Sequence, residues 1–409
     1  MKNFPPRMEE RFLIYRKYGG VLLAPLYFIY DLRVFFVIRN SGLFNVNWYI
    51  KCNPEAFPNG LVPGEHTILG IKITLYSKIR RVLEHPIWHY IRHGAGCGND
   101  PALFFGTTAY LDRYREVKKS GINPFYHFIR YGMAKKYTPC GKVAIDVANL
   151  EQIRRECRRK LGVSIISDEI VVDSEIPEIH GVAVHLHLYY PDMTDYFIGL
   201  LKNIPMKFDL FISRGYDHVD AERFTEIPNV DKITIKQFPN RGRDIAPLIL
   251  GFKELSNYEI VCHIHSKKSP HSVTLSNWMN QIANVLLGSP AQVGKIVTLL
   301  GNGDKFFYAK NHPDAMPDPA TGWSCNYESA GDILTRYTNI DIKELPVVEF
   351  PAGCMFWARR EALQRLFTLP LSWDDFPEEP IPPDGSIVHA IERLLLILSY
   401  DVPGRAWQD

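Results

Sequence analysis

The stretch Val182-Ala-Val-His-Leu-His-Leu-Tyr189 decides the fold class of this 409-residue chain. Its apolar and polar residues alternate, which is the period-2 pattern of a β-strand. Further strands are predicted at 208–213, 233–238 and 258–263, with helices at 193–203 and 244–255 among them. Strands that alternate with helices predict an α/β fold with a parallel sheet, whose ligand site lies at the carboxyl ends of the strands.

A change in charge divides the chain. Residues 1–160 contain 26 Lys and Arg against 12 Asp and Glu, a net +14, while residues 161–409 contain 21 against 33, a net −12. The net charge of +2 for the whole chain therefore results from two opposite charges that nearly cancel. A net charge this close to zero argues against a dedicated nucleic-acid-binding protein. We place a basic, mainly helical domain at 1–165, a linker at 166–180 and the α/β domain at 181–409.

The basic domain contains an internal repeat. The phrase His85-Pro-Ile-Trp-His-Tyr-Ile-Arg-His-Gly94 returns as Asn123-Pro-Phe-Tyr-His-Phe-Ile-Arg-Tyr-Gly132, and Phe44-Asn-Val-Asn-Trp-Tyr-Ile50 returns as Phe105-Gly-Thr-Thr-Ala-Tyr-Leu111. Repeated units of this kind bury their apolar faces on one another. We therefore predict a small α-helical domain with two repeat modules, at about 44–94 and 105–139.

The most hydrophobic stretch, 21–38, contains Asp31 and Arg33. Each charge costs about 3 kcal/mol at the centre of a bilayer, so we expect a core helix or a peripheral segment rather than a span. The basic charge suits the anionic inner leaflet of a membrane. Alternatively, the basic face docks on the acidic C-terminal domain or on a neighbouring transferase. Seven cysteines without a Cys-x-x-Cys pair, and a start without the pattern of a secretory leader, predict a reduced, cytoplasmic protein.

Four cations follow two of the predicted strands. Arg241 and Arg243 lie in the loop after the third strand, and Lys267 and Lys268 lie in the loop after the fourth. Because parallel strands end at the same edge of a sheet, these side chains are expected close together. Arginine grips phosphate through two parallel hydrogen bonds. The pattern predicts a diphosphate cradle, with ordinary salt bridges in solvated loops as the alternative.

Histidines recur at alternate positions of two predicted strands. His263 and His265 fall on one face if the fourth strand continues, and His185 and His187 have the same spacing. Such a pair could bind a metal, but the sequence around it shows no third ligand. We therefore favour structural histidines or histidines that hydrogen-bond a substrate.

The segment 350–359, Phe-Pro-Ala-Gly-Cys-Met-Phe-Trp-Ala-Arg, joins a turn of small residues to an aromatic strand. Small residues such as Gly353 let a ligand approach the backbone closely. Plain packing is the alternative, and periodicity does not decide between the two.

An acidic, proline-rich loop at 373–385 leads into a helix that carries His389 and Glu392. A carboxylate on this loop, such as Asp384, is suited to act as a general base, because it needs only hydrogen-bond reach to an acceptor hydroxyl. Several acids of the loop compete for this role, and a solvated acidic loop is the alternative.

Several phrases of the α/β part resemble the rhamnan synthesis protein F family of bacterial polysaccharide glycosyltransferases. They are HLYYPD (187–192), NRGRDIAP (240–247), HSKKS (265–269), PAGCMFWAR (351–359) and DGSIVHAIERLL (384–395). The resemblance covers roughly residues 180–400, and the N-terminal repeat phrases resemble modules that accompany such transferases. It implies a GT-A-like, Rossmann-type nucleotide-sugar domain that transfers a sugar, L-rhamnose from a nucleotide-activated donor, to a growing surface polysaccharide.

Many GT-A enzymes hold a divalent metal with Asp-x-Asp after the fourth strand, a motif that this sequence lacks. We expect Lys267 and Lys268 to replace the charge of that metal on the leaving diphosphate, so neither a metal nor another cofactor is expected. Asp384 is the expected base of an inverting transfer, with His389 and Glu392 as further catalytic residues. The residues expected to bind the donor are Asp192, Asn240, Arg241, Arg243, Asp244, His265, Ser266, Lys267, Lys268 and Gly353.

The expected partners are the nucleotide-sugar donor, a lipid-linked glycan acceptor, and either the inner-membrane surface or another polysaccharide-synthesis protein. No nucleic acid is expected. The alternative function is that of a non-catalytic glycan-binding or assembly subunit of a polysaccharide synthesis complex. Transfer or hydrolysis of a nucleotide sugar by the purified chain separates the two.

Overall fold

The computed structural model describes the chain at residues 24–57, 82–143, 149–161, 163–165, 179, 181–214, 222–266, 278–309, 322–345, 348–382 and 384–399. Its contacts divide the chain into two units. Unit 1 consists of residues 1–150 and 317–325, and unit 2 of residues 151–316 and 326–409. The polypeptide therefore leaves unit 2 once to contribute a short segment to unit 1.

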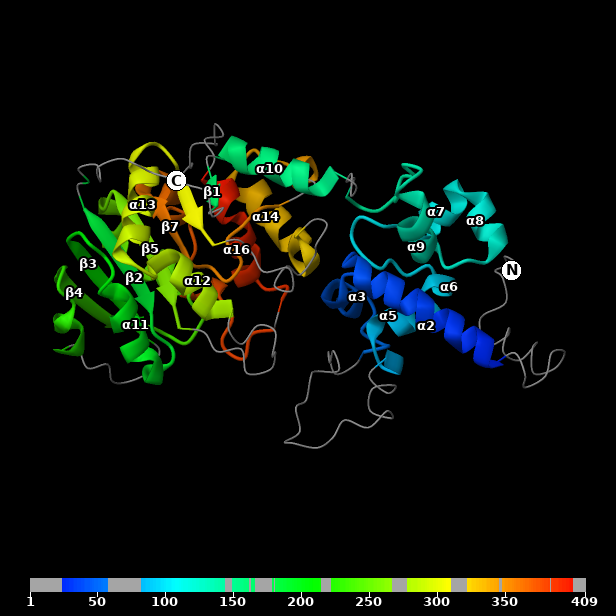
Figure 1. The fold of residues 1–409 in the computed structure, drawn as a ribbon, viewed down its shortest axis with the longest axis horizontal. Helices are drawn as coiled ribbons and strands as arrows, with labels where there is room; N and C mark the ends of the chain where they lie inside the picture. Colours follow the sequence, from blue (N-terminus) through cyan, green and yellow to red (C-terminus); the bar gives the residue numbers. More distant parts are fainter. Residues whose placement is uncertain are drawn as a thin grey trace. The chain divides into compact units, whose positions relative to one another are not determined.

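Unit 2 is built on a seven-stranded sheet with the strand order β1-β6-β7-β5-β2-β3-β4 (Figure 1). The strands are β1 (Val163–Ile165), β2 (Val182–His187), β3 (Phe208–Arg214), β4 (Val230–Gln237), β5 (Ile260–His265), β6 (Phe306–Tyr308) and β7 (Phe356–Arg359). Strands β4, β3, β2 and β5 run parallel, β1 is parallel to β6, and β7 is antiparallel to both β5 and β6. The α/β class with a mostly parallel sheet is confirmed.

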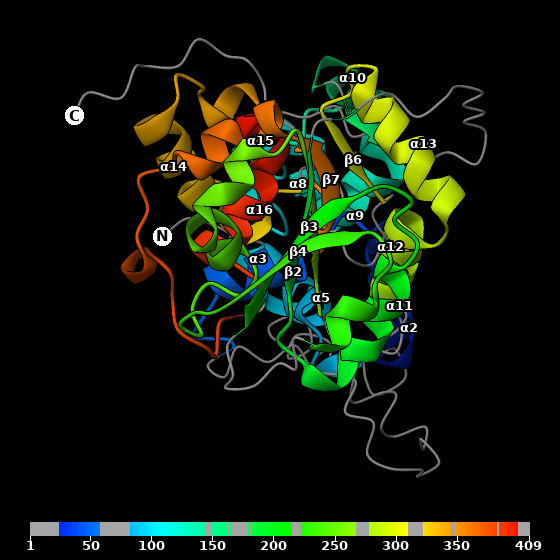
Figure 2. The same cartoon turned by 90° about the vertical axis from the view of Figure 1, so that its left-hand side faces the viewer.

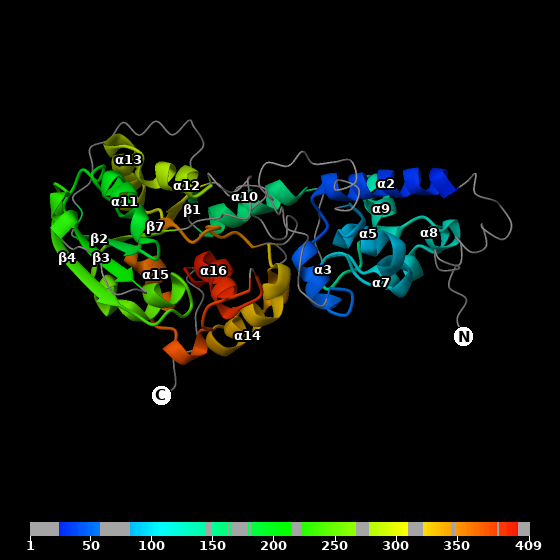
Figure 3. The ribbon, with the colours of Figure 1, turned by 90° about the horizontal axis from the view of Figure 1, so that it is seen from below.

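Helices cover both faces of this sheet (Figure 2 and Figure 3). One layer consists of α11 (Thr194–Leu201), α12 (Trp278–Leu287) and α13 (Pro290–Gly301), and the other of α14 (Tyr327–Tyr337), α15 (Arg360–Phe367) and α16 (Ile387–Leu398). Every residue of β2 and β5 is buried, as expected for parallel strands with both faces covered.

The helix expected at 244–255 is instead two short turns. A π-helical turn, η6 (Pro247–Gly251), and a 3-10 turn, η7 (Lys253–Asn257), meet at Phe252, whose backbone is not helical. The Phe252 ring is buried and packs edge-on against His185, Phe211 and Phe238. Since burying such a ring stabilises by roughly 2–3 kcal/mol, tertiary packing overrides the helical pattern here.

Unit 2 begins earlier along the chain than the boundary expected at 165. Helix α10 (Leu150–Leu161) falls almost entirely in unit 2, and β1 adds its three residues to the sheet beside β6. The expected linker lies outside the described residues except for residue 179. Three residues are too few for the sequence pattern to predict a strand, and the pairing with β6 provides the hydrogen bonds that define it.

The repeated phrases of unit 1 adopt the same local structure. The first forms α5 (Pro86–His89) and a π-helical turn η1 (Tyr90–Gly94), and the second forms α9 (Pro124–His127) and a π-helical turn η2 (Phe128–Gly132). Each begins with proline at the first helical position behind a side-chain cap. The two modules meet through aromatic rings, because Phe125 of the second packs edge-on against Tyr90 and Phe44 of the first.

A tyrosine, a histidine and a glycine recur together in both modules. Tyr49 of α3 (Val46–Cys52) hydrogen-bonds Nδ1 of His89 at 2.9 Å, and Tyr110 of α7 (Thr107–Arg113) hydrogen-bonds Nδ1 of His127 at 3.0 Å. The hydroxyl of each tyrosine lies against the glycine that ends its repeat phrase, Gly94 or Gly132. In each module, the repeated histidine and glycine are therefore the residues that hold the tyrosine hydroxyl in place.

The hydrophobic stretch forms helix α2 (Ala24–Ser41), which packs on α5 and α9 (Figure 3). Asp31 is buried in this helix and pairs with Arg92 at 2.8 Å. Among the described residues, no single helix has both the length and the hydropathy to cross a membrane. Helices α12 and α13 reach that hydropathy only as a pair bent by 71°.

We predict that Gly94→Ala destabilises unit 1 by about 1–3 kcal/mol, the usual cost of overpacking. An added methyl would overlap the Tyr49 hydroxyl and break its hydrogen bond to His89. Thermal unfolding of the full chain measures the effect. Gly96→Ala is the matched control, because a methyl there meets nothing within 4 Å; equal unfolding temperatures for the two variants would contradict the packing argument.

Candidate functional site

The strand order reverses between β2 and β5. From β2 the chain continues to β3 and β4 on one side, and it then returns to β5 on the other side. In open α/β sheets, ligands bind beyond the carboxyl ends of the strands at such a switch point. Strand β2 ends at His187 and β5 ends at His265, and the two are register partners. The topology therefore places two histidines at the edge where a ligand is expected.

Five buried side chains form a continuous series of hydrogen bonds, which we call the histidine chain. Ser213 Oγ lies 2.9 Å from Nδ1 of His187 and 2.8 Å from Nε2 of His185. Nδ1 of His185 lies 3.0 Å from Nδ1 of His263, whose Nε2 lies 3.2 Å from Oδ2 of Asp244. The register brings them together, because His185 pairs with His263 and His187 pairs with Ser213 across neighbouring strands.

Burial dominates the electrostatics of the histidine chain. It lowers the pKa of His187 to about 3 and, together with the neighbouring imidazoles, holds the pKa of His185 well below its ordinary value. Burial also lowers the pKa of His263, although Asp244 opposes that shift. Burial alone would raise the pKa of Asp244, but the nearby His265 and the hydrogen bond from His263 outweigh it and hold this pKa well below its usual range. The histidine chain therefore ends on the carboxylate of Asp244.

The turn before β7 is fixed from two sides. Nε2 of His265 donates to the carbonyl oxygen of Gly353 at 2.6 Å, and the backbone N–H of Gly353 donates to Oε1 of Glu392 at 2.7 Å. Gly353 has a φ of 87°, in the left-handed region that favours glycine. The following Cys354 also has a positive φ, of 53°. The turn thus links the end of β5 to helix α16.

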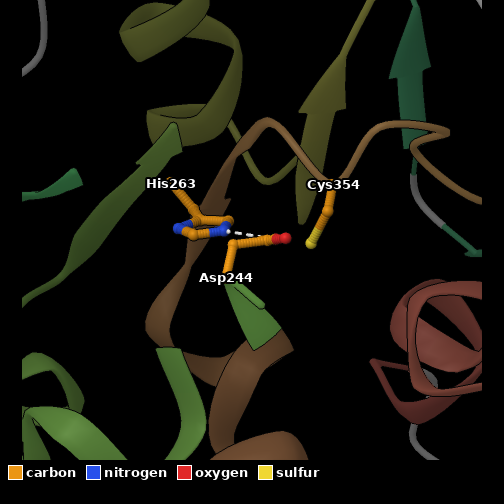
Figure 4. Close-up of side chains that lie close together, drawn as sticks. All are labelled: Asp244, His263 and Cys354. Carbon is orange, nitrogen blue, oxygen red and sulfur yellow. Dashed lines mark hydrogen bonds and ion pairs between the residues drawn. The ribbon is translucent and has the colours of Figure 1, made fainter. Parts of the chain in front are cut away.

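Asp244, His263 and Cys354 form a tight buried group (Figure 4). One potential ligand atom from each residue lies within 4.8 Å of the others, and the Asp244 carboxylate lies between the imidazole and the thiol. A set of oxygen, nitrogen and sulfur donors suits zinc better than magnesium or calcium. A closed structural zinc site needs four protein ligands, so these three atoms could hold only an incompletely coordinated cation.

Arg243 binds the acidic loop that precedes α16. Its guanidinium donates to Oε1 of Glu379 at 3.1 Å, to Nε2 of His389 at 3.1 Å and to the carbonyl oxygen of Ile381 at 2.9 Å. Because arginine has no acceptor, His389 accepts this hydrogen bond at Nε2. Its Nδ1 lies 2.8 Å from Oγ of Ser386 and 3.4 Å from the backbone nitrogen of Ser386, in the capping box of α16. His389 is thus held between the arginine and the helix cap.

Arg241 binds the same loop. Its Nε donates to the carbonyl oxygen of Phe376 at 2.9 Å, and its guanidinium pairs with Asp374 at 3.3 Å and Glu378 at 3.5 Å. The backbones of the two loops also pair with each other, in an isolated antiparallel β-bridge between Arg241 and Glu378. Together with those of Arg243, these contacts match the salt-bridge alternative stated for the two arginines.

Asp384 lies in a buried ion pair. Its Oδ1 is 3.1 Å from the guanidinium of Arg393 and 2.7 Å from Nδ2 of Asn326. The carboxylate side chain is 5% exposed and that of Arg393 is 3% exposed. Arg393 and Asn326 thus hold this carboxylate just before helix α16.

The remaining expected donor-binding residues fall into three groups. Ser266 is buried, and its Oγ accepts hydrogen bonds from the backbone N–H groups of Tyr189 and Tyr190, which ties together the loops after β2 and β5. Asp192 and Asn240 are exposed. Lys267 and Lys268 lie outside the described residues.

Sequence reasoning missed Ser213 and Cys354 as members of the site. Ser213 belongs to no motif, Cys354 belongs only to the phrase at 351–359, and each lies more than twenty residues from the histidines that it meets. The available signal was the matched spacing of the two histidine pairs, since equal spacing on adjacent parallel strands puts both pairs in register. Their neighbours became known only once the strand order and the turn before β7 were known.

The chain matches one family of known proteins. The model of the family described as rhamnan synthesis protein F matches residues 149–403. The chain belongs to this family. Its match begins at α10 and ends just after α16, so it covers unit 2 with all seven strands of the sheet. The resemblance inferred from the sequence is confirmed.

Two curated relatives are both named uncharacterized protein WxcX, from two strains of Xanthomonas campestris pv. campestris. Each is 29% identical to this chain over 218 residues, which are 53% of this chain. The match spans about a third of the length of these relatives, at 31%. No solved structure matches the chain.

We predict that the free energy of unfolding falls as the pH is lowered from about 6.5 towards 4. The buried histidines have lowered pKa values, so the unfolded chain binds more protons than the folded one in this window, and acid favours unfolding. One imidazole contributes at most about 1.4 kcal/mol per pH unit. Denaturant unfolding at several pH values should therefore give a shallower slope for His187→Gln, while His93→Gln, which changes an exposed side chain, should keep the slope of the wild type.

Proposed function

We propose that unit 2 is a glycosyltransferase that moves a sugar from a nucleotide-activated donor to a growing surface polysaccharide. The observation that carries the proposal is the pair of strands β2 and β5, whose polar ends lie side by side at the switch point of the sheet. Membership of the rhamnan synthesis protein F family supports a role in rhamnan or polysaccharide synthesis. L-rhamnose is the sugar that the family description suggests, and a GT-A-like donor site is the arrangement that we propose.

We propose that positive charge from the protein, rather than a divalent metal, stabilises the leaving diphosphate. Lys267 and Lys268 follow β5 in the sequence, where the chain has no Asp-x-Asp, and charge placed where the leaving group develops its own lowers the barrier. Arg241 and Arg243 have a different part in this proposal. Their contacts support a role in ordering the loop 373–382, which shapes the acceptor side.

For the acceptor we propose a lipid-linked glycan. Unit 1 carries most of the excess positive charge of the chain, and helix α2 exposes Ile29, Tyr30 and Phe36 beside Arg33 and Arg39. Apolar side chains flanked by cations suit an anionic membrane surface, where each nearby Arg or Lys contributes about 1 kcal/mol. An acidic surface of another polysaccharide-synthesis protein is the alternative partner.

The test of the proposed function is transfer by the purified full chain. A nucleotide sugar at 100 times its dissociation constant should raise the free energy of unfolding by about 2.7 kcal/mol, so thermal shift over a panel of donors selects the substrate. We predict that transfer from this donor proceeds in EDTA and gains little from added magnesium or manganese. Strict dependence on either ion would reject the metal-free mechanism. Neither transfer nor hydrolysis of any donor would instead favour a glycan-binding or assembly subunit.

We predict that Asp384→Asn lowers the rate of transfer by about 10²- to 10⁴-fold, the usual contribution of a general base, and leaves donor affinity unchanged. The carboxylate would accept the proton of the acceptor hydroxyl as that oxygen attacks the anomeric carbon in line, and the configuration inverts. Single-turnover rates and donor binding measure the two effects.

The buried pair with Arg393 requires a control for this variant. Arg393→Lys keeps the carboxylate and the charge but alters the pairing geometry. An equal loss of transfer in both variants would mean that Asp384 acts through the ion pair and not as the base. The next candidates would then be Asp375, Glu378 and Glu379.

A further inference from the structure

The histidine of the first repeat phrase lies among rings at the surface of unit 1. His89 is half-buried and contacts the rings of Phe57 and His93, whose centroids are 5.2 Å and 5.6 Å away. Together with Tyr49, which hydrogen-bonds His89, these residues form what we call the first ring cluster. Tyr49 is buried, but Phe57 is half-buried and His93 is exposed, so the cluster reaches solvent.

The second module has the same arrangement, which we call the second ring cluster. His127 is half-buried and contacts the rings of Tyr131 and Tyr137, whose centroids are 5.5 Å and 6.0 Å away. Tyr110 is the buried tyrosine that hydrogen-bonds this histidine. Tyr131 is exposed and Tyr137 is half-buried. Each cluster thus combines a buried tyrosine, a half-buried histidine and two rings that solvent reaches.

Duplication of the module accounts for only part of this likeness. His93 and Tyr131 each follow the histidine of their cluster by four residues, and a π-helical turn lies at that place in both modules. Such turns occur frequently at functional sites. Phe57 and Tyr137 do not correspond in this way, because Phe57 follows α3 and Tyr137 follows the second repeat phrase. The two modules therefore bring a ring to the histidine from different segments, as expected if both clusters bind the same kind of ligand.

The hydrogen bond with tyrosine uses only one nitrogen of each imidazole. Among the described residues, the imidazole hydrogen bonds of His89 and His127 go through Nδ1 and none goes through Nε2. Nε2 is a donor in one tautomer and an acceptor in the other, and a hydroxyl group suits both because it donates and accepts. Burial lowers the pKa of both imidazoles, so they do not offer the positive charge that an anion would need.

We propose that each ring cluster binds one sugar unit of a glycan chain. A sugar ring has an apolar face of C–H groups that packs on an aromatic ring, and hydroxyls at its edge that can hydrogen-bond an imidazole. Two similar sites in one chain suit a ligand that repeats, as a polysaccharide does. Two weak sites that are linked can bind a long chain far more tightly than either site binds alone.

This inference deepens the proposed function, because it assigns the growing polysaccharide to unit 1. It rests on that function only for the identity of the glycan as the acceptor. Phe57 and His93 are the residues that contact the sugar in the first ring cluster, and Tyr131 and Tyr137 are those in the second.

The test is binding of the purified full chain to an array of bacterial surface polysaccharides and their oligosaccharides, rhamnose polymers among them. Calorimetry with a retained oligosaccharide then compares variants of the two exposed residues. We expect His93→Ala and Tyr131→Ala each to raise its dissociation constant about 5- to 10-fold, as for one lost ring contact, and the double variant to raise it further. Leu83→Ala is the matched control and should bind like the wild type, because Leu83 is 43% exposed against 45% for Tyr131 but lies in neither ring cluster.

The outcomes separate this inference from the proposed function. If the wild type retains no glycan, or if the double variant binds as tightly as the wild type, the inference is overturned, and transfer from a nucleotide sugar in the same preparation would leave the proposed function standing. If the wild type retains a glycan through these residues but neither transfers nor hydrolyses any donor, the ring clusters are supported and the proposed function fails.

Discussion

The hydrogen bond from His263 to the carboxylate of Asp244 is the interaction on which the rest of the site depends. A buried carboxylate is costly unless it is paired and hydrogen-bonded, and at 7% exposure Asp244 meets this condition through the imidazoles around it. From His263 the hydrogen bonds continue through His185 and Ser213 to His187 at the end of β2. One loop residue is thus connected to side chains on three strands.

The loop that carries Asp244 also contains two arginines, which bind the acidic loop before α16. These arginines, Arg241 and Arg243, lie on either side of Gly242. Gly242 has a φ of 67° and Arg243 a φ of 52°, a local conformation that turns the two guanidiniums to this loop while Asp244 faces the sheet. The excess of acids in unit 2 is therefore partly neutralised within the site itself. The same short segment connects the donor side and the acceptor side of the proposed enzyme.

Unit 1 repeats one polar contact, a hydrogen bond between a tyrosine hydroxyl and a histidine. In each module a buried tyrosine is fixed by a histidine of the repeat phrase, and a glycine leaves room for its hydroxyl. The hydroxyl of a buried tyrosine usually forms a hydrogen bond. The repetition of this contact explains why the two phrases share the histidine and the final glycine. Helix α2 completes this core, and its one buried acid is matched by Arg92 of the first module.

The sequence by itself determined the α/β class, the positions of the central strands along the chain and the repeat in unit 1. These features depend on local periodicity and on residues close together in the chain, which the sequence displays directly. It also indicated that His185 and His187 share one face of a strand and that His263 and His265 share a face at the end of another, because residues two apart lie on the same side of a strand. It did not predict the broken helix at Phe252 or the short β1, because burial of a distant ring and pairing with β6 decide these.

Only the tertiary structure decided which side chains meet. Ser213, Asp244 and Cys354 reach the histidines from β3, from the loop after β4 and from the turn before β7, and nothing in their local sequence marks them as neighbours. The same holds for Arg243 and His389, which are 146 residues apart in the chain. A hydrogen bond depends on atoms a few ångströms apart in space, whatever their distance in sequence. For this reason the sequence could propose the chemistry of the site, whereas its hydrogen-bond partners had to come from the fold.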